Sequence, residues 1–169
     1  MSNAQPSYSR PLLILAGLLS IPLMAIIALF AAVGWGLMTG HVADTKVLPG
    51  GKLPPRITKI VSASAGLAQD ERILFFYSSA MTPEGDGNLL TDRRVVSYVA
   101  DGTDTWCDSI ALDEVESVDF IQSDSWLEDS TIVIVSTDGY ELTLYASNEG
   151  GGDVRFVDAI RRAAKLDLD

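Results

Sequence analysis

The chain has little of the chemistry that enzymes and metal centres need. Its 169 residues include one cysteine, Cys107, and one histidine, His41. A single cysteine excludes an intramolecular disulfide, so nothing in the chain requires an oxidising compartment. The part of the chain after residue 41 contains no histidine, so Ser-His or Cys-His catalysis and histidine metal sites are excluded in that part. Phosphate-binding glycine motifs and hydrolase motifs are also absent. We therefore expect a protein that is not an enzyme, with no catalytic residues, no metal and no cofactor.

Positive charge is scarce in the centre of the chain. Between Gly66 and Asp153 only Arg72, Arg93 and Arg94 are basic, against nineteen Asp and Glu residues. Nucleic acids and phosphoinositide headgroups are bound by clustered Lys and Arg, so we expect neither as a partner. The net charge of −11 favours solubility, and a basic protein partner is the alternative interpretation. The two adjacent arginines are expected to form salt bridges with neighbouring acids.

What the chain does have is an uncharged run of 27 residues from Leu12 to Met38. At about 1.5 Å per residue, a helix of this length extends for about 40 Å, enough to cross a membrane. A cleaved signal peptide is the alternative, but its apolar region is only about 7–15 residues long. The best cleavage candidate, after Ala43, has His41 at the −3 position, which fits poorly. We predict an uncleaved transmembrane helix over residues 11–40.

The residues that flank this run indicate its orientation. One basic residue, Arg10, precedes it, and four follow it closely: Lys46, Lys52, Arg56 and Lys59. Positively charged side chains near a span tend to stay on the cytoplasmic side. We predict a single-pass protein of the bacterial inner (plasma) membrane, with its N-terminus outside and its C-terminal domain in the cytoplasm.

Small residues recur at every fourth position along the predicted span, at Ala28, Ala32, Gly36 and Gly40. This spacing places them on one stripe of a helix, where a second helix can approach closely. The sequence therefore predicts a helix-packing interface with integral membrane protein subunits, although Ala and Gly are also common in spans without such a role. His41, at the expected membrane edge, is interpreted as an interfacial polar residue rather than a cofactor ligand.

The composition divides the chain into four parts. Residues 1–10 form an N-terminal tail, and the transmembrane helix occupies residues 11–40. Pro-Gly-Gly at 49–51 and Pro-Pro at 54–55 are incompatible with a helix interior or a central strand, so residues 41–55 are predicted to be a linker. Residues 56–169 are predicted to form the folded domain.

The pattern within the domain starts as a helix and then changes to strands. Apolar residues on one face predict a helix over 56–65, which Gly66 would terminate. Runs of β-branched, aromatic or alternating residues, separated by turn signals, then predict seven antiparallel strands, and Cys107 is expected to be a core or half-buried residue in one of them. The strands are predicted over 73–78, 88–91, 94–100, 105–110, 117–122, 131–136 and 140–146.

A C-terminal helix is predicted over residues 154–166. Apolar residues cluster on one side, and basic residues occupy the final turns, where they favour a helix C-terminus. Asp153 is expected to be the N-cap, and the three glycines at 150–152 are expected to form a flexible hinge.

Seven antiparallel strands followed by one helix is the order of elements in pleckstrin-homology (PH) domains. The chain also resembles bacterial PH-like and GRAM-like domains in three segments and the closing helix. The resemblance implies a mainly-β fold of two near-orthogonal sheets, with the C-terminal helix capping one end. The segments read DERILFFY at 70–77, NLLTDRRVVSY at 88–98 and IALDEVESV at 110–118.

The resemblance also implies where a lipid headgroup would bind, in the loop after the first strand. Here that loop, residues 79–87, contains two acids and no base, which disfavours a phosphoinositide. Glu84, Asp86 and Asn88 alternate with glycines and could suggest calcium, but the other ligands of an EF-hand are missing, so a solvated turn is the preferred interpretation.

These observations favour a membrane-anchored accessory subunit of a larger bacterial membrane protein complex. Such a subunit would pack through its transmembrane helix and dock through its PH-like domain. The alternative is a membrane-tethered PH-like sensor or adaptor that binds a lipid or a peptide.

Overall fold

The computed structural model describes residues 10–101, 104–125 and 127–166. The chain divides into two compact units, residues 1–36 and residues 37–169, and each unit is described by itself.

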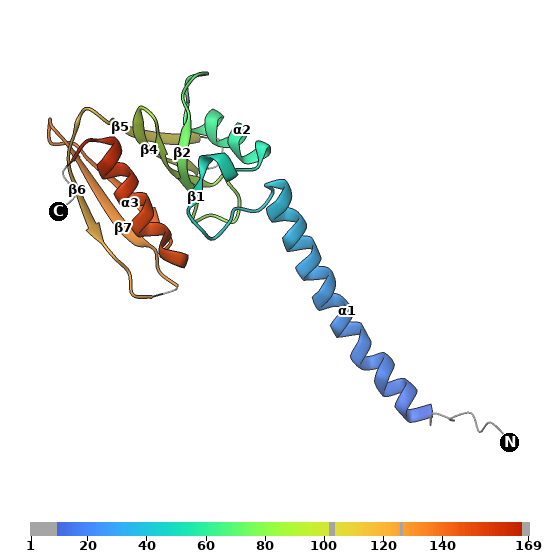
Figure 1. Ribbon diagram of the computed structural model, residues 1–169. Helices are drawn as coiled ribbons and strands as arrows, with labels where there is room; N and C mark the ends of the chain where they lie inside the picture. The colour runs from blue at the N-terminus through green and yellow to red at the C-terminus, as the bar shows by residue number, and fades with distance from the viewer. Residues whose placement is uncertain (1–9, 102–103, 126, 167–169) are drawn as a thin grey trace. The chain divides into compact units, whose positions relative to one another are not determined.

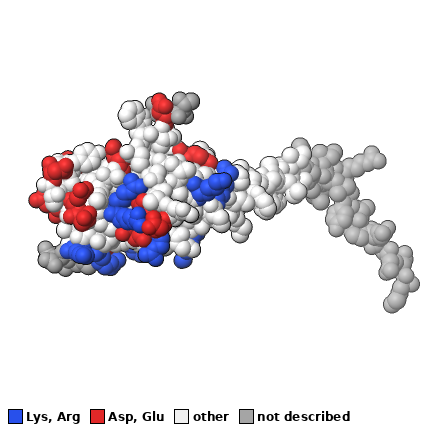
Figure 2. Space-filling model, turned by 90° about the horizontal axis from the view of Figure 1, so that it is seen from above, with Lys and Arg blue, Asp and Glu red and all other residues white. Residues whose placement is uncertain are grey.

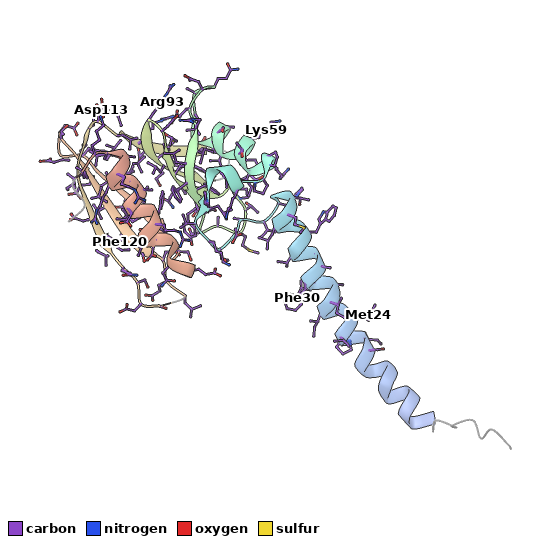
Figure 3. The ribbon with its side chains drawn as sticks, in the orientation of Figure 1. Met24, Phe30, Lys59, Arg93, Asp113 and Phe120 are labelled. Atoms are coloured by element: carbon purple, nitrogen blue, oxygen red, sulfur yellow. The ribbon has the colours of Figure 1, made fainter. Side chains whose placement is uncertain are left out.

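The described part of the N-terminal unit is the helix α1 (Arg10–Thr39), which continues for three residues into the second unit. Pro22 lies inside this helix without ending it. Large apolar side chains such as Met24 and Phe30 project from α1 and are exposed (Figure 3). Exposed apolar surface of this extent is typical of a segment that contacts a membrane or another protein. Among the described residues, α1 is the one helix long and apolar enough to span a membrane, and an N-terminal signal sequence would meet the same criterion.

The second unit contains two antiparallel sheets within the described ranges, preceded by the short helix α2 (Pro55–Ser64) and followed by α3 (Gly152–Ala163). The larger sheet has the strand order β1-β2-β3-β4-β5, and the smaller one β6-β7-β8. Figure 1 shows α3 lying against the smaller sheet and α2 beside the larger one. The strands are β1 (Leu48–Pro49), β2 (Ile73–Tyr77), β3 (Asp86–Thr91), β4 (Arg94–Asp101), β5 (Asp104–Ala111), β6 (Val115–Ile121), β7 (Ser130–Ser136) and β8 (Glu141–Ala146).

All seven predicted strands are therefore confirmed, with ends shifted by a few residues, and so is the C-terminal helix. This order of elements matches a PH-like fold.

The larger sheet is covered on both faces, because successive side chains along a strand point to opposite sides. Leu90 and Val95 face the smaller sheet and α3, whereas their neighbours Leu89 and Val96 face α2. This is why β3 and β4 carry consecutive apolar residues instead of a strict alternation. In the smaller sheet the alternation is clean, and β7 and β8 bury every second residue.

The main core lies between the two sheets and α3. Its central aromatic contact joins Phe75 of β2 to Phe156 of α3, with ring centroids 6.1 Å apart. Each fully buried large apolar side chain contributes about 1.5–3 kcal/mol relative to an exposed one. The core also contains Tyr77, Leu90, Val95, Ile110, Val118, Ile132, Ile134, Leu142, Leu144, Val157 and Ile160.

The end of α2 confirms the predicted role of Gly66. Gly66 has a φ of +57°, and its N–H donates to the carbonyl of Ala63 at 3.3 Å. The N–H of Leu67 donates to the carbonyl of Ser62 at 2.9 Å. This pair of bonds is the Schellman motif, which satisfies the last carbonyls of a helix.

Residues 41–55, for which the sequence predicts a linker, are packed as part of the domain. Leu48 and Pro49 pair with Phe76 and Phe75 as the edge strand β1. Val47 and Leu53 are buried, and residues 50–52 form a 3₁₀ turn. The prolines and glycines do exclude a long element here, but a two-residue strand tolerates them at a sheet edge.

The three glycines at 150–152, for which the sequence predicts a hinge, form a 3₁₀ turn (Glu149–Gly151) and the first residue of α3. Gly150 and Gly151 have φ values of +61° and +71°, which other residues rarely adopt. A Cβ on Gly152 would lie 2.9 Å from the carbonyl oxygen of Ser147, so this position is also closely packed. The predicted N-cap was wrong as well, because Gly151 is the N-cap. Asp153 is fully buried inside the first turn, where it accepts a 2.7 Å hydrogen bond from Ser130.

Cys107 corrects a further prediction. It lies on β5 as expected, but it is exposed. β5 is the last strand of the larger sheet, and residues 104–109 on it are all exposed. Even so, partial desolvation raises the pKa of the Cys107 thiol.

Candidate binding cleft

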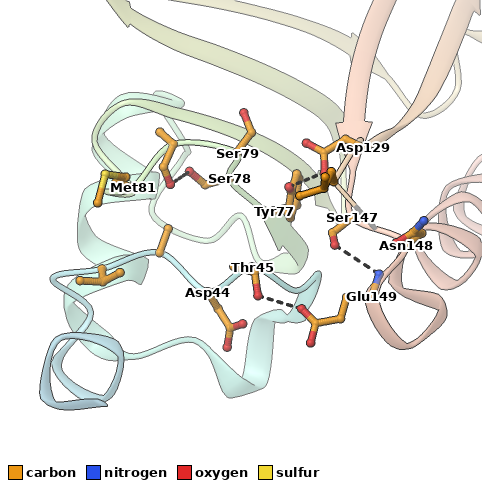
Figure 4. A pocket seen from close by; sticks show the side chains of 14 residues that line it. Asp44, Thr45, Tyr77, Ser78, Ser79, Met81, Asp129, Ser147, Asn148 and Glu149 are labelled. Atoms are coloured by element: carbon orange, nitrogen blue, oxygen red, sulfur yellow. Dashed lines mark hydrogen bonds between the residues drawn. The ribbon is translucent and has the colours of Figure 1, made fainter. Parts of the chain in front are cut away.

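A cleft of about 820 Å³ opens on the domain where four separate segments meet. This volume is within the range of about 300–1,000 Å³ that is common for ligand sites. Figure 4 shows the polar side chains that surround it. Its lining comes from residues 42–45, from the end of β2 and the following loop (residues 77–81), from residues 127 and 129, and from residues 147–149.

The β2–β3 loop on one side of the cleft is organised by a single carboxylate. Asp86 accepts hydrogen bonds from the hydroxyls of Ser78, at 2.6 Å, and Ser79, and from the N–H of Ala80 at 3.1 Å. Glu84 forms an ion pair with Arg56 at 3.1 Å. The loop is therefore more than the solvated turn that the sequence predicts. Its acids are engaged within the protein, and no group of three or more metal-ligating side chains occurs among the described residues.

The segment that follows α1 forms a second wall. The N–H of Ala43 donates to the carbonyl of Met81 at 3.0 Å, which joins this segment to the β2–β3 loop. Glu149 accepts a hydrogen bond from Thr45 at 2.8 Å and forms an ion pair with Lys46 at 3.1 Å. These two interactions lower the pKa of Glu149 below its usual value. The segment is thus attached to both neighbouring walls.

The third wall connects the two sheets. The hydroxyl of Tyr77, on β2, donates to Oδ1 of Asp129 at 2.7 Å. Burial and the neighbouring Asp129 raise the pKa of Tyr77, so the phenol stays a hydrogen-bond donor. The side-chain amide of Asn148 donates to the carbonyls of Ser123 and Ser125, both at 2.9 Å, and holds the β6–β7 loop. The cleft is therefore supported on every side by hydrogen bonds.

The lining of the cleft is acidic. Among the described residues that line it, Asp44, Asp129 and Glu149 are acidic and none is Lys or Arg. At the same cleft the side chains of Met81 and Leu127 are 84% and 73% exposed. Such a surface repels phosphate and offers both carboxylates and apolar contact area to a ligand.

The central arginines are used elsewhere, in what we call the arginine cluster: Arg72, Arg93 and Arg94 with their partners Asp92, Asp70 and Glu71. Arg72 pairs with Asp92 at 2.9 Å, Arg93 pairs with Asp70, and Arg94 pairs with Glu71 at 3.0 Å. The predicted salt bridges of the arginine pair are confirmed. Figure 2 shows the basic and acidic side chains of the visible face lying next to one another.

Arg94 forms the most buried of these pairs. The side chain of Glu71 is 3% exposed, and Arg94 also donates to the carbonyl of Gly66 at 3.0 Å. Burial alone would raise the pKa of Glu71, but hydrogen bonds from Arg94, Thr91 and Ala68 outweigh it and lower the pKa. This pair attaches the end of α2 to β4.

The predicted helix-packing residues are only partly brought together. Ala28, Ala32 and Gly36 lie on α1, where both alanines are exposed and Gly36 is buried. Gly40 follows the end of the helix with a φ of +72°, and a Cβ there would lie 2.8 Å from Cγ1 of Ile57. Gly40 therefore serves the end of the helix and the packing of the domain. His41, the other residue considered near the membrane edge, shares a 2.8 Å hydrogen bond with Thr39.

Sequence reasoning did not find the cleft residues. Asp44, Thr45, Asp129, Asn148 and Glu149 lie in loops that are far apart in the chain, and no motif connects them. The one available signal was the acidic loop after the first long strand, which excluded a phosphate ligand without revealing the cleft.

Comparison with known proteins gives limited additional information. No family model matches the chain, and no curated protein matches it. Among solved structures, the chain is similar to a DUF1696 family protein with a pleckstrin-homology domain from Shewanella loihica PV-4, with a TM-score of 0.46 and 13% identity over 73% of this chain and 97% of that one. It is also similar to a pleckstrin-homology domain from Shewanella amazonensis SB2B, with a TM-score of 0.47 and 17% identity over 64% of this chain and 87% of that one. The description of the fold rests on the strand order and closing helix of this chain.

Proposed function

We propose that this protein is a non-catalytic accessory subunit of a bacterial membrane protein complex, anchored by α1 and binding a partner protein through its PH-like domain. The observation that carries the proposal is the cleft, whose described lining has three carboxylates and no cation. A site of this kind disfavours anionic lipid headgroups. Protein surfaces present both cations and apolar groups and fit it better.

The proposal places α1 across the inner membrane, with the domain in the cytoplasm. The support is the basic bias after the helix, together with the exposed apolar side chains along it. Labelling of single cysteines placed at residues 8 and 116, in a Cys107→Ser background, checks this topology in intact cells. An impermeant maleimide should label residue 8 only. Labelling of residue 116 in intact cells would show that the domain lies outside, which is the reverse of the proposed orientation. Loss of the N-terminal segment from the mature protein would indicate a signal sequence.

The stripe formed by Ala28, Ala32 and Gly36 is proposed to pack against another membrane helix. Ala32→Leu, at an exposed position of the stripe, should reduce the recovery of co-purifying membrane subunits after extraction of native membranes in mild detergent. Gly34→Leu is the matched control, because a Cβ at Gly34 meets nothing within 4 Å and residue 34 points about 200° away from residue 32 around the helix. Equal recovery for both variants would remove the stripe from the proposal.

The second candidate function, a tethered adaptor that binds a peptide on its own, is also supported by the cleft. The same purification distinguishes the accessory subunit from the adaptor. Stoichiometric integral membrane subunits support an accessory subunit, whereas a protein that purifies alone from native membranes supports the adaptor.

A further inference from the structure

We infer that the cleft binds an extended segment of the partner that carries Lys or Arg beside an aliphatic residue, and that this segment is the cytoplasmic juxtamembrane part of a membrane-spanning subunit. The inference rests on the proposed function and names the chemistry of the partner at the same site.

The charges of the cleft select a cation. Each carboxylate in it is held in place: Asp129 by the hydroxyl of Tyr77, Asp44 by the N–H of Lys46 at 3.1 Å, and Glu149 by Thr45 and Lys46. Asp44 and Asp129 are half-buried, and these bonds engage one oxygen of each carboxylate, so that no other described residue bonds the second oxygen and a ligand can reach it. An incoming guanidinium or ammonium would meet preoriented acceptors, which strengthens a charge-assisted hydrogen bond.

The apolar groups at the cleft select a peptide over a small cation. Met81 and Leu127 lie on different loops, and both are largely exposed. Exposed side chains of this size contribute little to the fold, but they can cover an aliphatic residue of a ligand. A segment that combines a basic and an aliphatic residue would contact both kinds of group at once.

The position of the cleft along the chain selects the source of that segment. Val42 in its lining follows the end of α1 by three residues, a reach of about 10 Å at most. The cleft is therefore held close to the end of the proposed span. Cytoplasmic segments next to membrane spans are enriched in Lys and Arg, so a neighbouring subunit presents complementary charge at this level.

Photo-crosslinking of the full-length protein in native membranes tests this inference directly. A photoreactive phenylalanine analogue replaces Met81 or Leu127, whose exposure makes the substitution harmless to the fold. Control positions are Trp106 and Ile121, which are 70% and 66% exposed and do not line the cleft. Mass spectrometry of the crosslinked peptides then identifies the occupant.

We expect positions 81 and 127, but neither control, to crosslink to a Lys- or Arg-bearing segment next to a membrane span. The crosslinking yield should fall roughly tenfold in an Asp44→Asn/Asp129→Asn background, because the loss of charged contacts at the centre of an interface typically weakens binding by at least this factor. It should stay within about twofold in Glu116→Gln/Glu141→Gln, which removes the same charge from exposed positions outside the cleft.

Several results would overturn the inference. Crosslinks to lipid, to an acidic or neutral segment or to a soluble protein would do so, as would a yield that Asp44→Asn/Asp129→Asn leaves unchanged. If membrane subunits co-purify but positions 81 and 127 give no crosslink, the inference fails and the proposed function stands. If no membrane subunit co-purifies and the crosslinks reach only a soluble protein, both fail.

Discussion

The arginine cluster and the cleft contain similar charged groups and use them differently. In the cluster, three guanidiniums and three carboxylates are matched one to one, and the innermost pair holds α2 to the larger sheet. In the cleft only Glu149, of the three carboxylates, forms an ion pair, with Lys46, and the described part of the lining contains no Lys or Arg. The comparison teaches that acidic residues indicate a binding surface only where basic side chains have not already paired with them. The cluster stabilises the fold, and the carboxylates of the cleft are the ones that we propose to bind a partner.

The largest expected effect on stability concerns Arg94. Arg94→Met leaves the buried carboxylate of Glu71 without its partner, so the free energy of unfolding should fall by about 3 kcal/mol. Arg72→Met, at an exposed pair, should cost less than about 1 kcal/mol. Thermal and urea unfolding of the full-length protein in detergent, followed by circular dichroism, measures both. Equal losses would mean that burial does not distinguish these pairs.

The next effect tests how firmly the walls of the cleft are built. Gly152→Ala places a methyl group 2.9 Å from the carbonyl oxygen of Ser147 and 3.1 Å from Val47. We expect a loss of about 1–3 kcal/mol. Gly51→Ala is the control, because a Cβ there meets nothing within 4 Å. A Gly152→Ala variant as stable as the control would show that this wall of the cleft accommodates an added methyl group at little cost.

Acid should remove the contribution of Glu71 to stability. The pKa of Glu71 is lower in the folded protein than its ordinary value of 4.5, so ionised Glu71 stabilises the fold fully above that pH. The contribution is lost as the pH falls through the lowered pKa. Glu71→Gln should therefore flatten the decline in unfolding free energy on acidification below about pH 5. Glu149→Gln, at an exposed residue of the cleft, should flatten it less, and the reverse order would contradict the comparison.

The smallest expected effect is on the stability of the cleft variant. Asp44→Asn/Asp129→Asn should change the unfolding free energy by about 0.5 kcal/mol or less, because asparagine still accepts the hydrogen bond of Tyr77. Chemical denaturation of this variant, with Glu116→Gln/Glu141→Gln as the control, measures the unfolding free energy. A loss above about 2 kcal/mol would make the cleft acids structural, like those of the cluster.

The sequence was sufficient for the elements that local pattern determines. Alternation and β-branched runs located the seven long strands, and Gly66 marked the end of α2 because a left-handed residue after a helix favours glycine. The short strand β1 could not be found in this way. It exists because Leu48 and Pro49 pair with a strand about 26 residues further along the chain, and its own composition resembles a linker.

The glycines and the cleft show a second limit. The triple glycine at 150–152 has the composition of a hinge, but it forms a 3₁₀ turn with two positive φ values, and Gly152 is closely packed at the start of α3. The cleft depends on side chains such as Tyr77 and Asp129, which lie 52 residues apart. Only the folded arrangement of the two sheets brings them within 2.7 Å, and no local pattern encodes that distance.

The strand β1 has one more consequence, for self-association. An open sheet edge is a template on which another chain can add a strand. Here the protein's own segment after α1 covers the β2 edge of the larger sheet, and it does so with a proline. Pro49 has no N–H to donate, so an approaching strand finds a missing hydrogen bond at this position. The segment that connects α1 to the rest of the domain thus also protects this edge from pairing with a second copy of the chain.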